Sequence, residues 1–120
     1  MNLIDTIRRV PRPVRKVLQE RKELTRDLFR YLEGRLDIIN EIVLIGSGTS
    51  GTSCQTSKEF VETASGISTT AILPNIFLEK KIYNPNALYI FTSQSGTSTL
   101  VNIAQRKMKK LGYATASVTE

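Results

Sequence analysis

Short apolar runs alternate with helical patterns over the second two-thirds of the chain. Three such runs cover residues 42–45, 68–73 and 87–92, and each stops at a glycine, a proline or a serine-rich turn. Uninterrupted apolar runs of this length are typical of strands buried in a parallel sheet. A fourth strand is predicted over residues 114–118.

The segments between these runs have helical spacing. A helix over residues 51–64 and a helical turn near residues 76–82 are predicted. After the third run, a helix that ends at Gly112 places Leu100, Ile103, Ala104, Lys107 and Leu111 on one side. The alternation of strand and helix predicts an α/β fold: a doubly wound parallel sheet between two helical layers, with right-handed crossovers.

The first 40 residues have a different pattern. Apolar residues at positions 3, 4, 7 and 10 predict a short helix that ends at Pro11. A longer helix follows, with Pro13 in its first turn and Gly34 just after its end. We therefore divide the chain into an N-terminal helical segment, 1–40, and an α/β domain, 41–120. The apolar stripes of the N-terminal helices require cover from the α/β body or from a second subunit.

The charge of the chain is +6, and ten of its cations precede the first strand. Six acidic residues alternate with them, which is typical of solvated helix faces with ion pairs. This mixing of signs argues against a nucleic-acid partner, and no apolar run is long enough to predict a membrane span. The cation excess would favour an anionic small-molecule substrate.

Two residue counts limit the chemistry. Cys54 is the single cysteine, so no internal disulfide can form, and a cytoplasmic location fits. The chain has no histidine, the commonest metal ligand and general acid or base. We therefore expect neither a metal site nor a cofactor.

Two loops carry the candidate chemistry. Residues 46–53 follow the first strand and residues 93–98 follow the third, and both are rich in glycine, serine and threonine and lead into helices. If the first strand is central, both loops lie at the carboxyl edge of the sheet, where ligands bind in such folds. Helix N-termini with free N–H groups and hydroxyls suit a phosphate. The same residue types also serve as helix caps and turns, but two such loops exceed what capping requires.

Gly46, Gly48 and Gly51 also match the dinucleotide-binding spacing. That alternative requires an acid at the end of the second strand, to hold a ribose hydroxyl. The second strand is followed instead by Pro74 and Asn75, and no acid occurs before Glu79. A P-loop is excluded, because no Gly-Lys-Ser/Thr follows the first strand.

Residues 45–50 (Ile-Gly-Ser-Gly-Thr-Ser) and 93–98 (Ser-Gln-Ser-Gly-Thr-Ser) together resemble the sugar isomerase (SIS) domain family. This family includes the isomerase half of glucosamine-6-phosphate synthase, bacterial phosphosugar isomerases, deaminases and deglycases. The resemblance covers about residues 41–119 and implies a flavodoxin-like strand order 2-1-3-4. It also implies that hexose or aminohexose phosphates bind to Gly48, Thr49, Ser50, Ser93, Gln94, Ser95, Gly96, Thr97 and Ser98.

The sequence departs from the family pattern in three places. The acid that often follows the second strand is missing, and Thr97 stands where Glu is common. The sequence also ends after the fourth strand, so we expect the SIS-type domain to be incomplete at its C-terminus. A homodimer or a further SIS domain would then complete the protein.

Catalytic residues cannot be assigned from this sequence. Isomerisation requires a group that opens the sugar ring and a carboxylate that moves a proton. Glu59 and Glu62 are the nearest carboxylates to the first loop, and Glu59 is better explained as a solvated helix residue. The expected function is phosphosugar binding, as part of an isomerase, deaminase or deglycase. The alternatives are a non-catalytic sugar-phosphate sensor and, after it, a dinucleotide-binding domain.

Overall fold

The computed structural model describes residues 2–96 and 98–119. The chain divides into two compact units, Met1–Leu36 and Asp37–Glu120. No helix among the described residues combines the length and the apolar character needed to cross a bilayer.

The first unit consists of three helices, α1 (Leu3–Arg9), α2 (Pro11–Leu24) and α3 (Arg26–Leu32). The second predicted helix therefore begins at Pro11, earlier than expected, because the first helical turn does not need the N–H that proline lacks. It is also divided in two. At the break, the Thr25 hydroxyl donates to the Arg21 carbonyl oxygen at 2.6 Å, a back-bond that favours bending.

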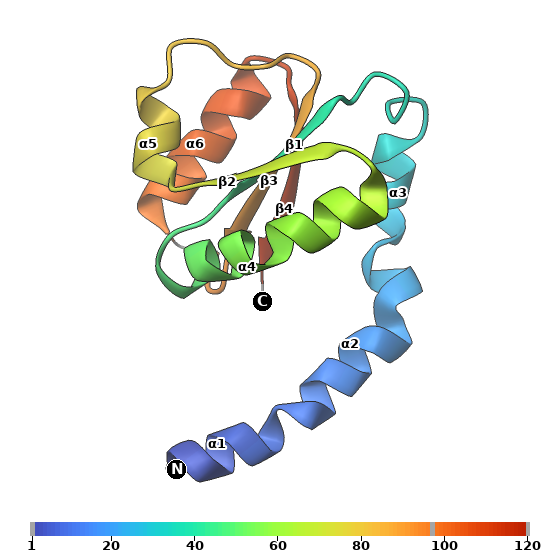
Figure 1. Cartoon of the computed structure of the whole chain (residues 1–120), viewed down its shortest axis with the longest axis vertical. Helices are drawn as coiled ribbons and strands as arrows, with labels where there is room; N and C mark the ends of the chain where they lie inside the picture. The colour runs from blue at the N-terminus through green and yellow to red at the C-terminus, as the bar shows by residue number, and fades with distance from the viewer. Residues whose placement is uncertain (1, 97, 120) are drawn as a thin grey trace. The chain divides into compact units, whose positions relative to one another are not determined.

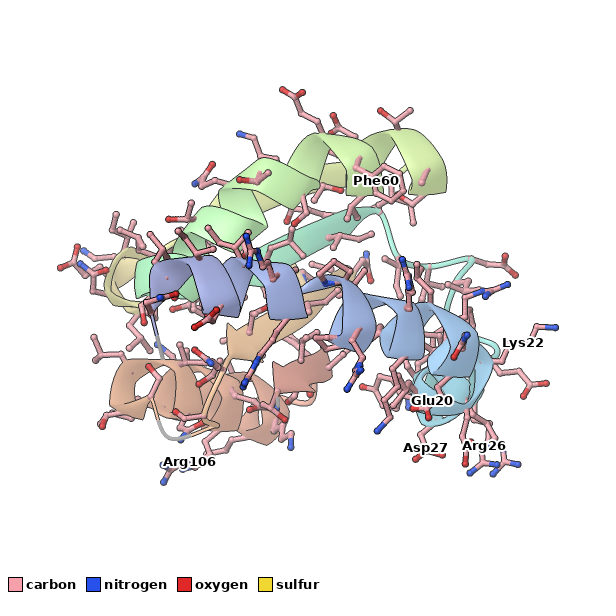
Figure 2. All side chains as sticks on the ribbon, turned by 90° about the horizontal axis from the view of Figure 1, so that it is seen from below. Glu20, Lys22, Arg26, Asp27, Phe60 and Arg106 are labelled. Atoms are coloured by element: carbon pink, nitrogen blue, oxygen red, sulfur yellow. The ribbon has the colours of Figure 1, made fainter. Side chains whose placement is uncertain are left out.

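The helices of the first unit do not bury their apolar stripes by themselves. Ten large apolar side chains in this unit are 50–74% exposed: Leu3, Ile4, Ile7, Val10, Val14, Val17, Leu18, Leu24, Phe29 and Leu36. Charged side chains such as Glu20, Lys22, Arg26 and Asp27 extend from α2 and α3 (Figure 2). The predicted amphipathic pattern is thus present, and the unit alone does not supply the cover that the pattern requires.

The second unit is a four-stranded parallel sheet in the order β2-β1-β3-β4, as predicted. The strands are β1 (Glu41–Ile45), β2 (Ser68–Ile72), β3 (Ala87–Ser93) and β4 (Ala114–Thr119). The helices are α4 (Gly48–Ser65), α5 (Pro74–Glu79) and α6 (Thr99–Lys110) (Figure 1). In β1, Ile45 pairs with Ile72 on one side and with Phe91 on the other.

Alternate residues of the strands form two separate cores, which makes three layers. On one face, Val43 and Ile45 pack with α5 and α6 through buried residues that include Phe77 and Ala104. On the other face, Ile42 and Leu44 pack with Cys54 of α4. This alternation is the period of two expected of a strand that is covered on both faces.

Two helix predictions need correction. The first sheet helix begins at Gly48, not at Gly51, so only Gly46 and Ser47 of the glycine loop lie outside it. Helix α6 buries Val101, Ala104 and Met108, whereas Leu100, Ile103 and Leu111 are 43–51% exposed. Of the five residues expected on one side of this helix, only Ala104 is therefore buried. Both sets of residues have helical spacing, and contact with the sheet selects the set with the smaller Val101 and the flexible Met108.

Candidate functional site

The two serine-rich loops lie side by side at the carboxyl edge of the sheet. Their strands, β1 and β3, are hydrogen-bonded neighbours, and Ile45 pairs with Phe91 near their ends. Strand β2 lies on the opposite side of β1, so the strand order reverses between β1 and β3. This is the position at which open α/β sheets bind ligands.

The three glycines after β1 have different physical roles. A Cβ on Gly51 would lie 2.8 Å from the Gly46 carbonyl oxygen, and one on Gly46 would lie 3.0 Å from the Ser50 carbonyl carbon. Gly48 has open space around it but a φ of +58°, which favours glycine. Gly46 and Gly51 therefore let α4 approach the end of β1, while Gly48 permits the turn into the helix.

The N-terminus of α4 presents unpaired donors. Ser47 is the N-cap residue, and its side chain makes no capping hydrogen bond. Gly51 N–H donates to the Ser47 carbonyl oxygen at 3.2 Å, whereas the first three N–H groups of a helix have no intrahelical acceptor. The N–H groups of Gly48, Thr49 and Ser50 are thus available to an anion, and the helix dipole favours negative charge there.

The second loop is braced by its own side chains. Ser93 is buried, and its hydroxyl oxygen accepts from Gly96 N–H at 3.1 Å. The Asn102 side-chain amide, from α6, donates to the Gly96 carbonyl oxygen at 3.1 Å. Gly96 has a φ of +71°, so glycine suits this turn. These contacts hold Gly96 against the end of β3 and against α6.

A hollow of about 400 Å³ joins the two loops, a volume within the range of small-ligand sites. Its lining comes from α4, β3, β4 and the start of the second loop: Thr49, Ser50, Ser53, Thr92, Ser93, Gln94, Val118 and Thr119. Four of the nine residues expected to bind phosphosugar are therefore brought together here.

Of the other five residues predicted to bind phosphosugar, the four that the structure describes are not among those that line the hollow. Gly48, Ser95, Gly96 and Ser98 do not line the hollow, and Thr97 lies outside the described residues. The sequence interpretation did not anticipate Thr92, Val118 and Thr119 as part of the site. The parallel pairing of Ser93 with Thr119 places the end of β4 beside the second loop, which the strand order 2-1-3-4 could have indicated.

The hollow carries no formal charge, because its lining residues have hydroxyl, amide and apolar side chains. Glu59 is exposed on α4, nine residues after Ser50, which corresponds to about 13 Å along a helix axis. The Glu62 carboxylate accepts from Thr69 N–H at 3.0 Å and so ties α4 to β2. Among the described residues, no group of three or more His, Cys, Asp or Glu side chains could hold a metal.

Cys54 lies behind the hollow and is protected from reaction. Burial raises the pKa of its thiol, and a hydrogen bond with the Thr92 side chain partly offsets this rise. Because the thiolate is the reactive form, we expect a thiol reagent at neutral pH to label the folded chain about 100-fold more slowly than the urea-unfolded chain. Equal labelling rates would show that α4 does not stay packed on the sheet.

Searches with the sequence found no matching family model and no matching curated protein. Solved structures do match. A candidate phosphosugar isomerase from Clostridium difficile 630 is 23% identical with a TM-score of 0.79, and the match covers 99% of this chain and 33% of that one.

Two further neighbours have the same fold. Glucosamine-6-phosphate deaminase from Thermotoga maritima is 25% identical with a TM-score of 0.61, over 87% of this chain and 34% of that one. Tagatose-6-phosphate ketose/aldose isomerase from Escherichia coli is 20% identical with a TM-score of 0.64, and the match covers 90% of this chain and 30% of that one. These structures confirm the resemblance to SIS-type proteins at the level of the fold. The present chain spans about a third of the length of these neighbours.

Proposed function

We propose that the hollow between the two loops binds the phosphate of a hexose or aminohexose phosphate. The proposal rests on the first turn of α4, where Thr49 and Ser50 line a hollow that Ser93 and Gln94 line from the other loop. The first N–H groups of a helix have no intrahelical acceptor. Such an arrangement suits a phosphomonoester, because donors surround the anion without a fixed cation. Ser95, Gly96, Thr97 and Ser98 would complete the site on the second-loop side.

The names of the structural neighbours support the sugar part of this proposal. Their names describe isomerases or a deaminase of phosphosugars, and their folds match most of this chain with TM-scores of 0.61–0.79. We infer that this chain serves as part of an isomerase, deaminase or deglycase of this kind and acts in the cytoplasm.

A second function, non-catalytic sensing of a sugar phosphate, is favoured by one observation. None of the side chains that line the hollow can transfer a proton near neutral pH, and Glu59 is remote along α4. Measurement of both binding and turnover separates the two functions. Binding of glucosamine 6-phosphate without isomerisation or ammonia release would support the sensor.

We also infer that the chain works as a homodimer or beside a further SIS-type domain. The first unit exposes ten large apolar side chains, and such stripes are normally covered. Light scattering of the 120-residue chain at high concentration tests the homodimer. If the chain is a monomer, the homodimer is wrong, and only the further SIS-type domain could cover the apolar side chains.

Thermal unfolding with ligands tests the binding proposal. Fructose 6-phosphate or glucosamine 6-phosphate at ten times its Kd should stabilise the chain by about 1.4 kcal/mol, or roughly 5 °C in Tm. Fructose without the phosphate should leave Tm unchanged, because the proposed contacts are to the phosphate. If neither phosphosugar raised Tm at millimolar concentration, the proposal would be wrong.

A further inference from the structure

The charge of the second unit is concentrated on one side. Of its seven cations, all except Lys58 belong to residues 79–82, at and just after the end of α5, or to the second half of α6: Lys80, Lys81, Arg106, Lys107, Lys109 and Lys110. Glu79 is the one acid in these two segments. The six cations are exposed, and Figure 2 shows Arg106 extending away from α6.

The two segments lie together at one end of a helix pair. Helices α5 and α6 pack side by side (Figure 1). The Lys107 ammonium lies 3.3 Å from the Tyr83 hydroxyl and 5.0 Å from its ring centroid. This contact ties the chain just after α5 to the last turns of α6.

Each segment ends in the same short pattern, two lysines followed by an exposed apolar residue. Residues 80–82 are Lys-Lys-Ile and residues 109–111 are Lys-Lys-Leu. Ile82 is 84% exposed and Leu111 is 51% exposed. The negative end of a helix dipole explains lysines at these positions, but it gives no reason to expose isoleucine and leucine beside them.

We propose that this basic face, residues 80–82 and 106–111, binds the surface of a bilayer that contains anionic lipids. The cations contact lipid phosphates or carboxylates, and Ile82 and Leu111 enter the interface between the headgroups and the acyl chains. A nucleic acid would use the cations alone, since its phosphate backbone offers nothing to the two apolar side chains. The bilayer accounts for both features.

The basic face and the phosphosugar hollow can be occupied together. The hollow lies at the carboxyl edge of the sheet, beyond which α6 begins, and the basic face includes the last turns of α6. A helix of twelve residues spans about 18 Å. The proposal is therefore independent of the proposed sugar-phosphate site.

A tryptophan at position 82 tests the insertion directly, because the natural chain has no tryptophan. In the Ile82→Trp chain, vesicles of phosphatidylcholine with 30% phosphatidylserine should shift the emission to shorter wavelength, and lipids brominated on their acyl chains should quench it. Pure phosphatidylcholine vesicles should do neither. If emission is the same with all vesicles, the proposal is overturned.

Charge variants test the assignment to this face. The double variant Lys80→Gln, Lys81→Gln should lower partitioning to anionic vesicles by about 30-fold. The matched double variant Arg12→Gln, Lys16→Gln removes the same charge from the first unit and should change partitioning less than 5-fold. The proposal would be overturned if both variants lost vesicle partitioning equally. It would also be overturned if the unchanged chain bound duplex DNA but did not bind anionic vesicles. Far-UV circular dichroism confirms that the variants fold.

Discussion

Replacement of Ser50 by aspartate is expected to weaken phosphosugar binding by at least 100-fold without loss of stability. Ser50 is in the first turn of α4 and lines the hollow. A carboxylate there would repel a bound phosphate, by about 4 kcal/mol at 4 Å in a partly solvated site. The same carboxylate interacts favourably with the positive end of the helix, so the free energy of unfolding should stay constant or rise by about 0.5 kcal/mol. Calorimetric titration and urea unfolding measure the two effects.

Thr52→Asp is the matched control for this variant. It places the same charge on the same helix, two residues later, at an exposed position that does not line the hollow. We expect it to weaken binding less than 5-fold. If both variants weakened binding equally, repulsion within the hollow would not be the cause, and Ser50 would lose its assigned role.

Replacement of Gly51 by alanine should lower the free energy of unfolding by about 2 kcal/mol. The added Cβ would lie 2.8 Å from the Gly46 carbonyl oxygen, and this backbone atom cannot rotate away. Helix propensity alone predicts the opposite sign, because alanine stabilises a helix interior by about 1 kcal/mol relative to glycine. Urea unfolding thus separates close packing from propensity by the sign of the change.

Gly48→Ala is the comparison variant for the loss of stability expected in Gly51→Ala. Gly48 has no neighbouring atom within 4 Å of an added Cβ, but its φ is +58°. The expected loss is about 1 kcal/mol, from backbone strain alone. A Gly51→Ala chain more stable than the natural one would contradict the close approach of α4 to β1.

The sequence predicted the sheet well because strand signals are local. Apolar runs such as 87–92, and the turns that stop them, place the strands within one or two residues. The strand order came from the resemblance of the two loops to SIS-type proteins and is confirmed.

The start of α4 and the buried face of α6 depend instead on packing. The glycine loop could have been a turn, because Gly48 and Gly51 are poor helix formers. The structure makes it helical because Gly46 and Gly51 permit backbone contact. In α6, Leu100 and Val101 both continue a helical apolar stripe, and only contact with the sheet decides which is buried.

Only part of the site could be predicted, because some of its residues are brought in by contacts between distant segments. Thr49, Ser50, Ser93 and Gln94 belong to loops with a recognisable composition, and the hollow brings them together. Val118 and Thr119 belong to a strand end whose composition signals nothing. Their part in the site follows from the pairing of β3 with β4, a contact between segments about 26 residues apart.

The central claim is that the first turn of α4 and the start of the second loop hold the phosphate of a sugar. Titration of the 15N-labelled chain with fructose 6-phosphate, followed by amide NMR, tests it most directly. We expect the largest shifts at the amides of Thr49, Ser50 and Gln94, similar shifts with inorganic phosphate, and none with fructose. Shifts confined to other parts of the chain, or equal shifts with fructose, would contradict it.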